Sequence, residues 1–267
     1  MLFMDIGGRA IEYRVIPGAV SDRPPLVFLH EGLGCAALWR DFPDKVAREL
    51  GAPALVYSRF GYGQSAGLEG PRTPRFMHDE ALDVLPALLA RCGISRPLLI
   101  GHSDGASIAL IHAASAGRPV AGLVLMAPHI MVEPISLESI ARIRAIYAEG
   151  PLRARLARYH ARVDDAFRGW ADIWLDPAFR DWSLEREARA LSIPTLLIQG
   201  RDDEYGTLAQ IDRIAGLAPG PIERLVFENC GHSPHRDQEA AVLAAIVGFA
   251  VQHFARRARQ DGSGKGP

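Results

Sequence analysis

The sequence predicts an α/β protein: a mostly parallel, eight-stranded sheet with helices on both faces and an inserted helical cap. Short apolar runs, typical of strands buried on both faces, alternate with helical segments along most of the 267-residue chain. The alternation stops at residues 129–192, where helical runs follow one another, and then resumes. Strands that alternate with helices favour a parallel sheet with right-handed crossovers.

The individual elements follow from local patterns. Gly7-Gly8 between the first two strand-like runs predicts a two-residue hairpin. The predicted strands are residues 2–6, 9–16, 26–29, 54–57, 98–100, 123–126, 195–198 and 222–227. Apolar residues at helical spacing predict helices at residues 36–50, 78–92, 106–114, 207–215 and 237–255. Pro86 lies inside the second of these helices and predicts a kink there.

The interrupted region defines the domain organisation. Three of the four tryptophans, Trp170, Trp174 and Trp182, lie within it. Its predicted helices are residues 138–149, 152–162 and 164–174. We therefore expect a core formed by residues 1–128 and 193–255 and a helical cap, or lid, formed by residues 129–192. Residues 256–267 are charged and glycine-bearing, and we expect a disordered tail.

Composition excludes several classes of partner. Thirty basic and 31 acidic residues give a net charge of -1, which does not favour binding to nucleic acid or to a membrane surface. No segment reads as a signal peptide or as a membrane span. Cys35, Cys92 and Cys230 are odd in number and widely spaced, so we expect neither disulfides nor a metal site and place the protein in the cytoplasm. The sequence does not indicate an oligomeric state.

A Gly-x-Ser-x-Gly motif spans Gly101 to Gly105, with Ser103 at its centre. Such short matches also arise by chance in loops. Here an apolar strand precedes the motif and a helix of small residues follows it, which favours a sharp turn that exposes the serine hydroxyl. The helix N-terminus would supply N–H groups suited to a developing oxyanion.

Two further groups follow predicted strands. Asp202 and Asp203 come after residues 195–198, and His232 comes after residues 222–227. Ligands bind beyond the carboxyl ends of parallel strands, so these side chains are expected near Ser103. A serine hydroxyl needs an adjacent base, and imidazole can accept and return that proton near neutral pH. A carboxylate would fix the imidazole tautomer.

These motifs together resemble the α/β-hydrolase superfamily over about residues 2–255. The resemblance rests on the Gly-x-Ser-x-Gly elbow, the Gly-x-x-Asp turn that ends at Asp203, the Gly-His pair at His232 and the chain order Ser, Asp, His. It implies a catalytic set of Ser103, His232 and Asp203. Asp202 is the alternative acid, and His235 is the alternative base.

The oxyanion hole is expected to use the backbone N–H of Asp104 and a second donor from the loop after residue 29. The family usually has His-Gly in this loop, whereas this chain has His30-Glu31-Gly32. The second donor is therefore Gly32 or Leu33. Glu31 is an unusual neighbour for a negative charge, and we expect it to turn away or to pair with Arg59.

Other motifs carry simpler interpretations. His30 and His102 are expected to be structural hydrogen-bonding residues. His129, His232 and His235 lack a metal-binding pattern, so we predict no metal and no cofactor. The glycines of residues 59–65 resemble the family's Arg-Gly-x-Gly-x-Ser turn with Phe60 inserted, and the missing third glycine argues against nucleotide binding.

The function predicted from these features is that of a serine hydrolase acting on a small carboxylic ester, lactone or thioester. The partner would be a small-molecule acyl substrate. Trp170 and Trp174 either pack the cap against the core or line an apolar substrate pocket. Two alternatives remain: a hydrolase that cleaves carbon–carbon bonds in ring-cleavage products, and a non-catalytic ligand receptor on the same fold.

Overall fold

In the computed structural model, strands form an eight-stranded sheet in the order β1-β2-β4-β3-β5-β6-β7-β8. The structure describes residues 1–20, 23–115, 117–147 and 150–261, with side chains described up to residue 254. Strand β2 is antiparallel to β1 and β4, and the other pairs are parallel, which confirms the predicted fold class. The strands are β1 (Leu2–Ile6), β2 (Arg9–Ile16), β3 (Leu26–Leu29), β4 (Ala54–Tyr57), β5 (Leu98–His102), β6 (Gly122–Met126), β7 (Thr195–Gly200) and β8 (Ile222–Phe227).

The parallel register brings the carboxyl ends of the central strands to one edge. Leu29 at the end of β3 pairs with Gly101 of β5, and His102 of β5 pairs with Met126 of β6. Strands β3, β5, β6 and β7 are buried along their whole length, as their continuous apolar sequences predict. The loops that leave these strands therefore start side by side.

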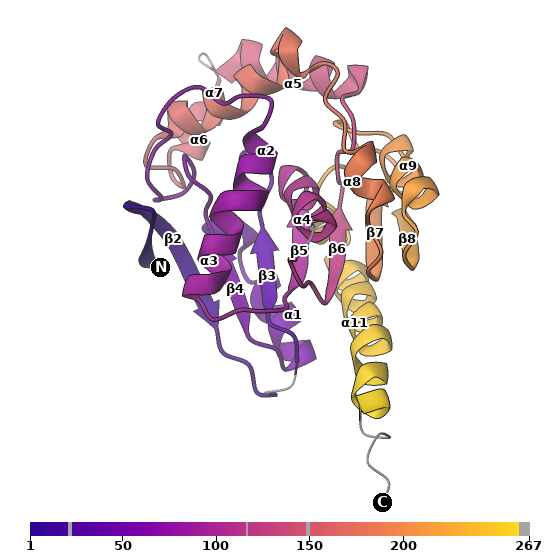
Figure 1. Cartoon of the computed structure of the whole chain (residues 1–267). Coiled ribbons are helices and arrows are strands. Elements are labelled where there is room, and N and C mark those ends of the chain that lie inside the picture. Colours follow the sequence, from indigo (N-terminus) through magenta and orange to yellow (C-terminus); the bar gives the residue numbers. More distant parts are fainter. Residues whose placement is uncertain (21–22, 116, 148–149, 262–267) are drawn as a thin grey trace, which may run out of the picture.

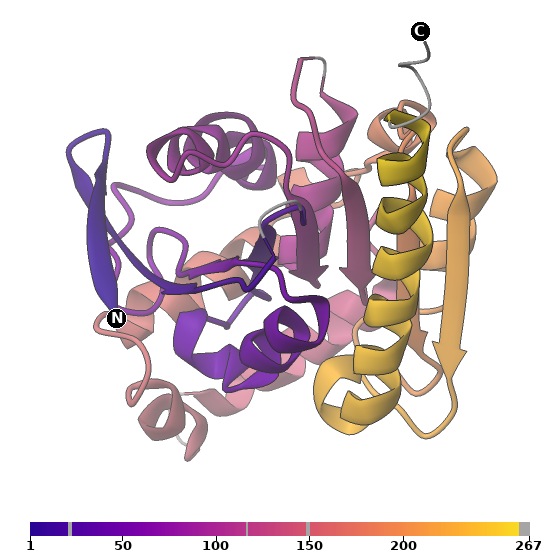
Figure 2. The ribbon, with the colours of Figure 1, turned by 90° about the horizontal axis from the view of Figure 1, so that it is seen from below.

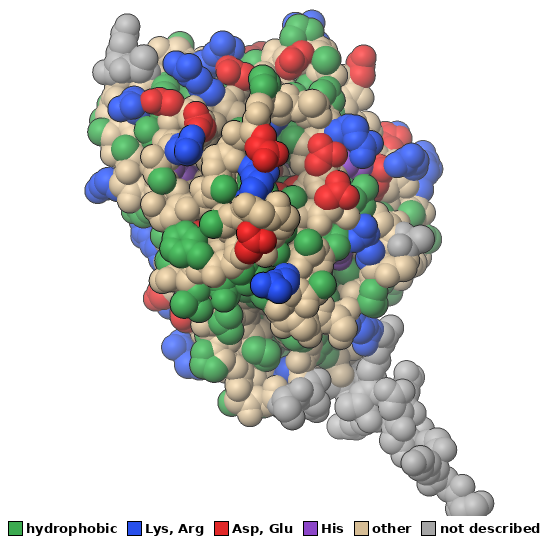
Figure 3. All heavy atoms as spheres, turned by 60° about the vertical axis from the view of Figure 1, so that its left-hand side comes forward, with side chains coloured by type: hydrophobic (Ala, Val, Ile, Leu, Met, Phe, Trp, Pro, Cys, Tyr) green, Lys and Arg blue, Asp and Glu red, His purple; other side chains and the backbone are tan. Residues whose placement is uncertain are grey.

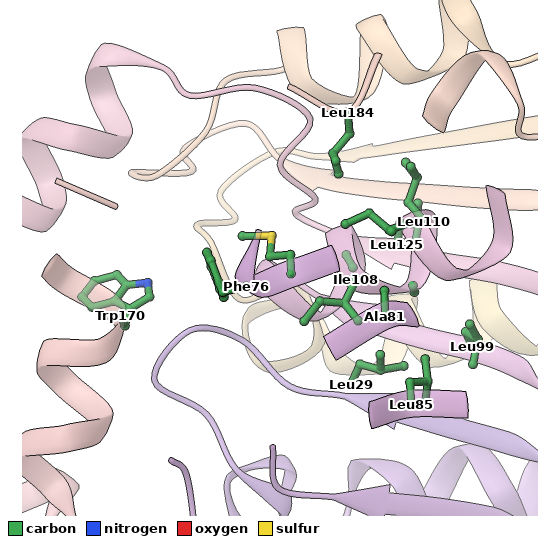
Figure 4. Packing of buried hydrophobic residues seen from close by; sticks show 14 of the residues in the cluster. Leu29, Phe76, Ala81, Leu85, Leu99, Ile108, Leu110, Leu125, Trp170 and Leu184 are labelled. Carbon is green, nitrogen blue, oxygen red and sulfur yellow. The ribbon is translucent and has the colours of Figure 1, made fainter. Parts of the chain in front are cut away.

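One face of the sheet is covered by helices α2 (Phe76–Asp79), α3 (Leu85–Arg91), α4 (Asp104–Ala114), α8 (Glu185–Arg189) and α9 (Ala209–Leu217), seen in front of the strands in Figure 1. Figure 4 shows part of the packing: Leu125 of the sheet lies beside Leu110 of α4, and Leu99 and Ile108 belong to the same cluster. Trp170 lies at the outer limit of this cluster, on a helix beyond the sheet edge. The core therefore continues from the sheet towards the cap.

The kink predicted at Pro86 is a π-helical turn, Glu80–Val84, between α2 and α3. In this turn the N–H of Leu85 donates to the carbonyl of Glu80, and Pro86 has no N–H for the next carbonyl. His112 Nδ1–H on α4 donates to the carbonyl of Ala81 instead, at 2.8 Å. A side chain from the neighbouring helix thus replaces the missing backbone bond.

The opposite face carries α1 (Phe42–Leu50) and α11 (Glu239–Asp261), which Figure 2 shows across the sheet from α3 and α4. Helix α10 (Pro234–Asp237) precedes α11. Helix α11 is assigned to Asp261, and residues 262–267 lie outside the described residues, so the disordered tail expected at residues 256–267 stays a prediction. Within the described ranges, no helix is both long and apolar enough to cross a membrane.

Helices α5 (Pro134–Tyr147), α6 (Leu152–Leu156) and α7 (Val163–Trp174) lie between β6 and β7 in sequence and over the sheet edge in Figure 1. The division into residues 1–128 with 193–255 and a cap of residues 129–192 stays a prediction.

On the face shown in Figure 3, acidic and basic side chains are interspersed, in keeping with the net charge of -1.

Two predicted helices are shorter than expected. The helix at residues 36–50 divides into a 3-10 turn, Ala36–Trp39, and α1, with Arg40 at a φ of 53° between them and Pro43 near the start of α1. Helix α6 ends at Leu156 rather than at residue 162. Beyond Leu156 the chain is bound to the loop at Gly63: the N–H of Gly63 donates to His160 Nδ1 at 2.9 Å.

Candidate active site

Ser103 occupies the turn between β5 and α4. Its φ is 54° and its ψ is -122°, a strained conformation for a residue with a side chain. Neighbouring backbone passes so close that a Cβ on Gly105 would lie 2.1 Å from the carbonyl oxygen of Leu29. A Cβ on Gly101 would lie 2.5 Å from the Cα of Ala106. Both glycines are therefore required by the close approach of the backbone on either side of the serine.

His232 links Ser103 to Asp203. Its Nε2 lies 2.9 Å from Ser103 Oγ, and its Nδ1 lies 2.8 and 2.9 Å from the two carboxylate oxygens of Asp203. The carboxylate fixes the proton on Nδ1, so Nε2 can accept the proton of the serine hydroxyl. The structure therefore joins the three residues that the sequence singled out in one hydrogen-bonded chain.

The two alternatives from the sequence lie elsewhere. Asp202 is exposed, and its backbone N–H donates to the carbonyl of Cys230. His235 is buried against the rings of Trp39 and Phe42, and neither nitrogen of its ring has a hydrogen-bond partner in the described part of the chain. The geometry thus selects Asp203 and His232.

Asp203 is held from several sides. Gln199 Nε2 donates to its Oδ2 at 2.6 Å, and the backbone N–H groups of Tyr205 and Gly206 donate to its Oδ1 at 2.8 and 3.2 Å. Burial, the strongest influence, favours the neutral acid, but the charge and hydrogen bond of His232 and the Tyr205 N–H outweigh it. The pKa of Asp203 is therefore below its ordinary value, and the group is a carboxylate at neutral pH.

His232 shows the reciprocal effect. Burial is again the largest influence and would lower the pKa of the imidazole. The charge and hydrogen bond of Asp203, with smaller effects of Glu204 and Glu31, reverse this, and the pKa of His232 is raised above 6.5. A basic imidazole with a fixed tautomer can take the proton from Ser103 and can be stabilised once it carries it.

A cavity of about 100 Å³ opens above Ser103 and His232. Trp170 and Trp174 of α7 both line this cavity. This position is the one expected if they line an apolar substrate pocket. Trp174 Nε1–H also donates to Asp104 Oδ1 at 3.2 Å, so α7 contacts the residue next to the serine. The remaining lining residues are Glu31, Gly32, Leu33, Asp104, His129, Ser136, Ile140 and Tyr205.

The expected oxyanion donors border this cavity. Asp104 begins α4, and its backbone N–H is one of the unpaired donors at the helix N-terminus. Gly32 and Leu33 line the cavity on the other side of Ser103. A Cβ on Gly32 would lie 2.2 Å from Trp170 Nε1, so the indole requires a glycine here. The choice between Gly32 and Leu33 as the second donor stays open.

Glu31 turns away from the serine. Its carboxylate lies 3.3 Å from an Arg236 guanidinium nitrogen and 3.5 Å from His102 Nδ1. Arg59 binds the carbonyl oxygen of Glu31, at 2.9 Å, rather than its carboxylate. Burial would raise the pKa of Glu31, but His102 and Arg236 reverse this, and the pKa lies well below its ordinary value. The expected ion pair therefore forms with Arg236 instead of Arg59.

His30 and His102 tie loops together. Nδ1–H of His30 donates to the carbonyl of Glu31 at 2.7 Å, and the ring's Nε2 accepts the backbone N–H of Arg59 at 3.0 Å. His102 Nε2–H donates to the carbonyl of His232 at 2.6 Å. The residue beside the serine thus supports the loop that carries the candidate base.

Four cavity residues were not identified as site residues from the sequence: His129, Ser136, Ile140 and Tyr205. His129 follows β6 closely, so its position at a strand end was available as a signal. Ser136 and Ile140 lie on α5, and no local pattern marks the side of this helix that meets the core. No group of three or more His, Cys, Asp or Glu side chains that could hold a metal ion is found among the residues described.

A comparison with protein-family models agrees with the fold. Residues 26–245 match the model of the alpha/beta hydrolase family, and the chain belongs to this family.

Known relatives cover nearly the whole chain at low identity. A proline iminopeptidase of Lactobacillus helveticus is 21% identical over 94% of this chain and 97% of its own. A 2-succinyl-6-hydroxy-2,4-cyclohexadiene-1-carboxylate synthase of Serratia proteamaculans is 26% identical over 89% of this chain and 97% of its own. Among solved structures, an esterase of Thermogutta terrifontis matches with a TM-score of 0.72 and 21% identity, covering 94% of this chain and 97% of its own.

Proposed function

We propose that this chain is a serine hydrolase that cleaves a small carboxylic ester, lactone or thioester through an acyl-enzyme. The observation that carries the proposal is the hydrogen-bonded chain from Ser103 through His232 to Asp203 at the base of the cavity. This order of contacts provides a nucleophile, its base and the group that orients the base.

The first half of the reaction follows from this geometry. Ser103 Oγ attacks the carbonyl carbon while its proton moves to His232 Nε2. The carbonyl electron pair moves onto oxygen, and the N–H of Asp104 with that of Gly32 or Leu33 stabilises the oxyanion. When the tetrahedral intermediate collapses, His232 gives the proton to the departing alcohol or thiol, which leaves an ester on Ser103.

The second half uses the same groups on water. His232 takes a proton from a water molecule, whose oxygen attacks the acyl carbon. The second tetrahedral intermediate collapses, Ser103 recovers its proton from His232, and the carboxylic acid leaves. Asp203 stabilises the imidazolium twice in each turnover without taking the proton itself.

The cavity walls indicate the character of the substrate. Trp170, Trp174 and Ile140 supply apolar walls, as is usual in small-molecule sites. A small acyl group with an apolar or aromatic portion fits these walls. The relative from Lactobacillus helveticus is named as an iminopeptidase, so an amide belongs in the substrate panel beside esters, lactones, thioesters and vinylogous diketones.

The first experiment tests the nucleophile without knowledge of the natural substrate. The protein is incubated with a fluorophosphonate, and the modified residue is identified by mass spectrometry; hydrolysis of short-chain p-nitrophenyl esters is measured in parallel. We expect the adduct on Ser103 and a loss of ester hydrolysis of at least about 10³-fold in Ser103→Ala.

Ser115→Ala serves as the matched control, since Ser115 lies at the opposite end of α4 and its Oγ–H donates to the carbonyl of Ile111. This variant should hydrolyse the esters at the wild-type rate. Equal slow rates for the wild type and Ser103→Ala, with no adduct, would favour the ligand-receptor alternative. Cleavage restricted to vinylogous diketones would favour carbon–carbon bond hydrolysis.

A further inference from the structure

His129 stands in the wall of the catalytic cavity with no hydrogen-bonding partner for its ring in the described part of the chain. The residue is only 3% exposed. Its ring centroid lies 4.9 Å from that of Trp174, edge to face, and 5.6 Å from that of His232. A polar ring therefore borders the reacting groups, and the mechanism above does not use it.

Other polar groups of the same wall are already engaged. Ser136 Oγ–H donates to the carbonyl of Tyr205 at 2.5 Å. The Glu31 carboxylate pairs with Arg236 at 3.3 Å. Buried polar groups are rarely left without a partner, because each unsatisfied group costs about 1–3 kcal/mol. Among the described residues, two buried polar atoms of this wall lack a hydrogen bond, Oδ2 of Asp104 and Nδ1 of His129. The Asp104 carboxylate faces the Arg59 guanidinium at 3.9 Å, whereas the neutral ring of His129 faces no charged partner at such a distance.

The position of the ring is fixed by its backbone. The N–H of His129 donates to Ser107 Oγ at 3.1 Å, and Ser107 Oγ–H donates to the carbonyl of His129 at 2.6 Å. The next N–H, that of Ile130, donates to Gln210 Oε1 at 2.7 Å. A side chain on a segment bound from both sides is held in place before a ligand arrives, which lowers the entropic cost of binding to it.

Burial also determines the protonation of the ring. It lowers the pKa of His129 to about 3, with a smaller effect of His232, so the imidazole is neutral at neutral pH. A Cβ on Gly206 would lie 3.4 Å from Cε1 and 3.6 Å from Nδ1, so this edge of the ring faces protein. A buried N–H without an acceptor is rarer than a buried acceptor without a donor. The proton therefore belongs on Nε2, on the other edge.

We propose that His129 Nε2–H donates a hydrogen bond to an oxygen acceptor of the substrate. The acceptor is an uncharged ether, keto or hydroxyl oxygen, and it lies within reach of the wall between Trp174 and His232. This proposal rests on the proposed function, because it names the substrate class for the same cavity. The preferred substrate is then an oxygen-substituted ester rather than a plain hydrocarbon one.

The test compares matched esters that differ by one atom. Pentanoic acid, ethoxyacetic acid and 3-methoxypropanoic acid form isosteric p-nitrophenyl esters in which an ether oxygen replaces one methylene of the acyl chain. Butyl and 2-methoxyethyl pentanoate make the same replacement in the alcohol. Binding is measured by calorimetry with Ser103→Ala protein, in which the esters are not cleaved, and kcat/KM is measured with Ser103 present.

We expect His129→Phe to lower the ratio of oxygen-containing to hydrocarbon affinity by about tenfold for at least one pair, because its ring offers no donor. His235→Phe is the matched control: His235 is also buried without a hydrogen-bond partner but does not line the cavity, so its ratios should equal those of the parent. His129→Leu replaces the phenylalanine variant if that protein does not fold.

The outcomes separate the two proposals. A ratio that changes less than about threefold for every pair in His129→Phe or His129→Leu overturns the role of His129. Ester hydrolysis that persists in Ser103→Ala overturns the proposed function instead. In that case the kcat/KM ratios of the same ester pairs, compared between the parent and His129→Phe, decide the role of His129.

Discussion

The cavity has a base and a cover that are built by different means. The base consists of loops leaving parallel strands, and its groups are fixed by short hydrogen bonds: Asp203 accepts from Gln199, Tyr205 and Gly206 as well as from His232. The cover consists of α5 and α7, whose contribution is mostly ring and methyl surface. Reacting groups thus lie on the rigid part, and the part that contacts the rest of the substrate is held mainly by packing.

Few polar bonds join cover and base. For α5 and α7 they are the bonds from Trp174 Nε1–H to Asp104 Oδ1, from Ser136 Oγ–H to the carbonyl of Tyr205 and from Ser139 Oγ–H to the carbonyl of Glu204. Because few polar bonds join the cover to the base, side chains of the cover can be substituted without disturbing the catalytic geometry. Specificity depends on the shape of the cavity, whereas the chemistry depends on hydrogen bonds. Substitutions at the base of the cavity should therefore reduce turnover, whereas substitutions in the cover should alter stability and substrate preference.

The largest effect expected from this difference is that of Asp203→Asn. The amide keeps the shape of the carboxylate but cannot fix the Nδ1 proton of His232 or stabilise the imidazolium, so kcat should fall by about 10⁴-fold. Asp202→Asn is the matched control and should retain the wild-type rate, because Asp202 is exposed. Steady-state kinetics on one p-nitrophenyl ester checks both. If Asp202→Asn lost the larger share, the orienting acid would have to be reassigned.

The residues at the base of the cavity could be predicted from the sequence for a physical reason. Ser103 lies between an apolar run and a helix of small residues, and both patterns are local. Parallel strands bring their carboxyl ends together whatever the loops contain, so the positions of Asp203 and His232 follow once the strands are identified. Family resemblance was needed for one step, the choice of Asp203 over its exposed neighbour.

The cover could not be predicted to the same depth. Its helices were expected, but α6 ends early in a region where the chain is hydrogen-bonded to Gly63, which is far away in sequence: the N–H of Gly63 donates to His160 Nδ1, and the N–H of Ala161 donates to the carbonyl of Gly63. Glu31 pairs with Arg236, and these two residues are 205 positions apart in the chain. Contacts of this kind join residues that are far apart in the chain, and a local sequence pattern carries no information about which distant residues meet.

The next largest effect concerns the polar bond between cover and base. Trp174→Phe removes the indole N–H from Asp104, whose Oδ2 already lacks a hydrogen-bond partner in the described residues. Leaving a buried carboxylate with one donor fewer should cost about 1–3 kcal/mol of the free energy of unfolding, measured by urea denaturation.

Trp182→Phe controls for the lost ring volume in that experiment. Trp182 is also buried and packs against Trp174, but its Nε1–H has no acceptor among the described residues, so the same replacement removes no hydrogen bond. Trp174→Phe should therefore be the more destabilising of the two. Equal losses would mean that the hydrogen bond from Trp174 to Asp104 adds nothing to the stability that packing of the ring provides.

The smallest effect expected is on pH dependence. General-base catalysis requires the neutral form of His232. The pKa of His232 is raised above 6.5 because the charge and hydrogen bond of Asp203 outweigh burial. As the pH falls through this raised pKa, His232 becomes protonated and kcat/KM declines, so the midpoint of the acid limb should lie above 6.5. Asp203→Asn removes the opposing charge, and the midpoint should then move to lower pH.

Because that variant turns over slowly, the imidazole is better followed directly. The Cε1–H resonance of His232, titrated by NMR in Ser103→Ala protein with and without Asp203→Asn, reports the same pKa without catalysis. His129 supplies an internal contrast in the same spectra, since its pKa is lowered to about 3 and its resonance should not move between pH 5 and 9. A His232 midpoint below 6.5 with Asp203 intact would show that burial, rather than the carboxylate, sets the basicity of the base.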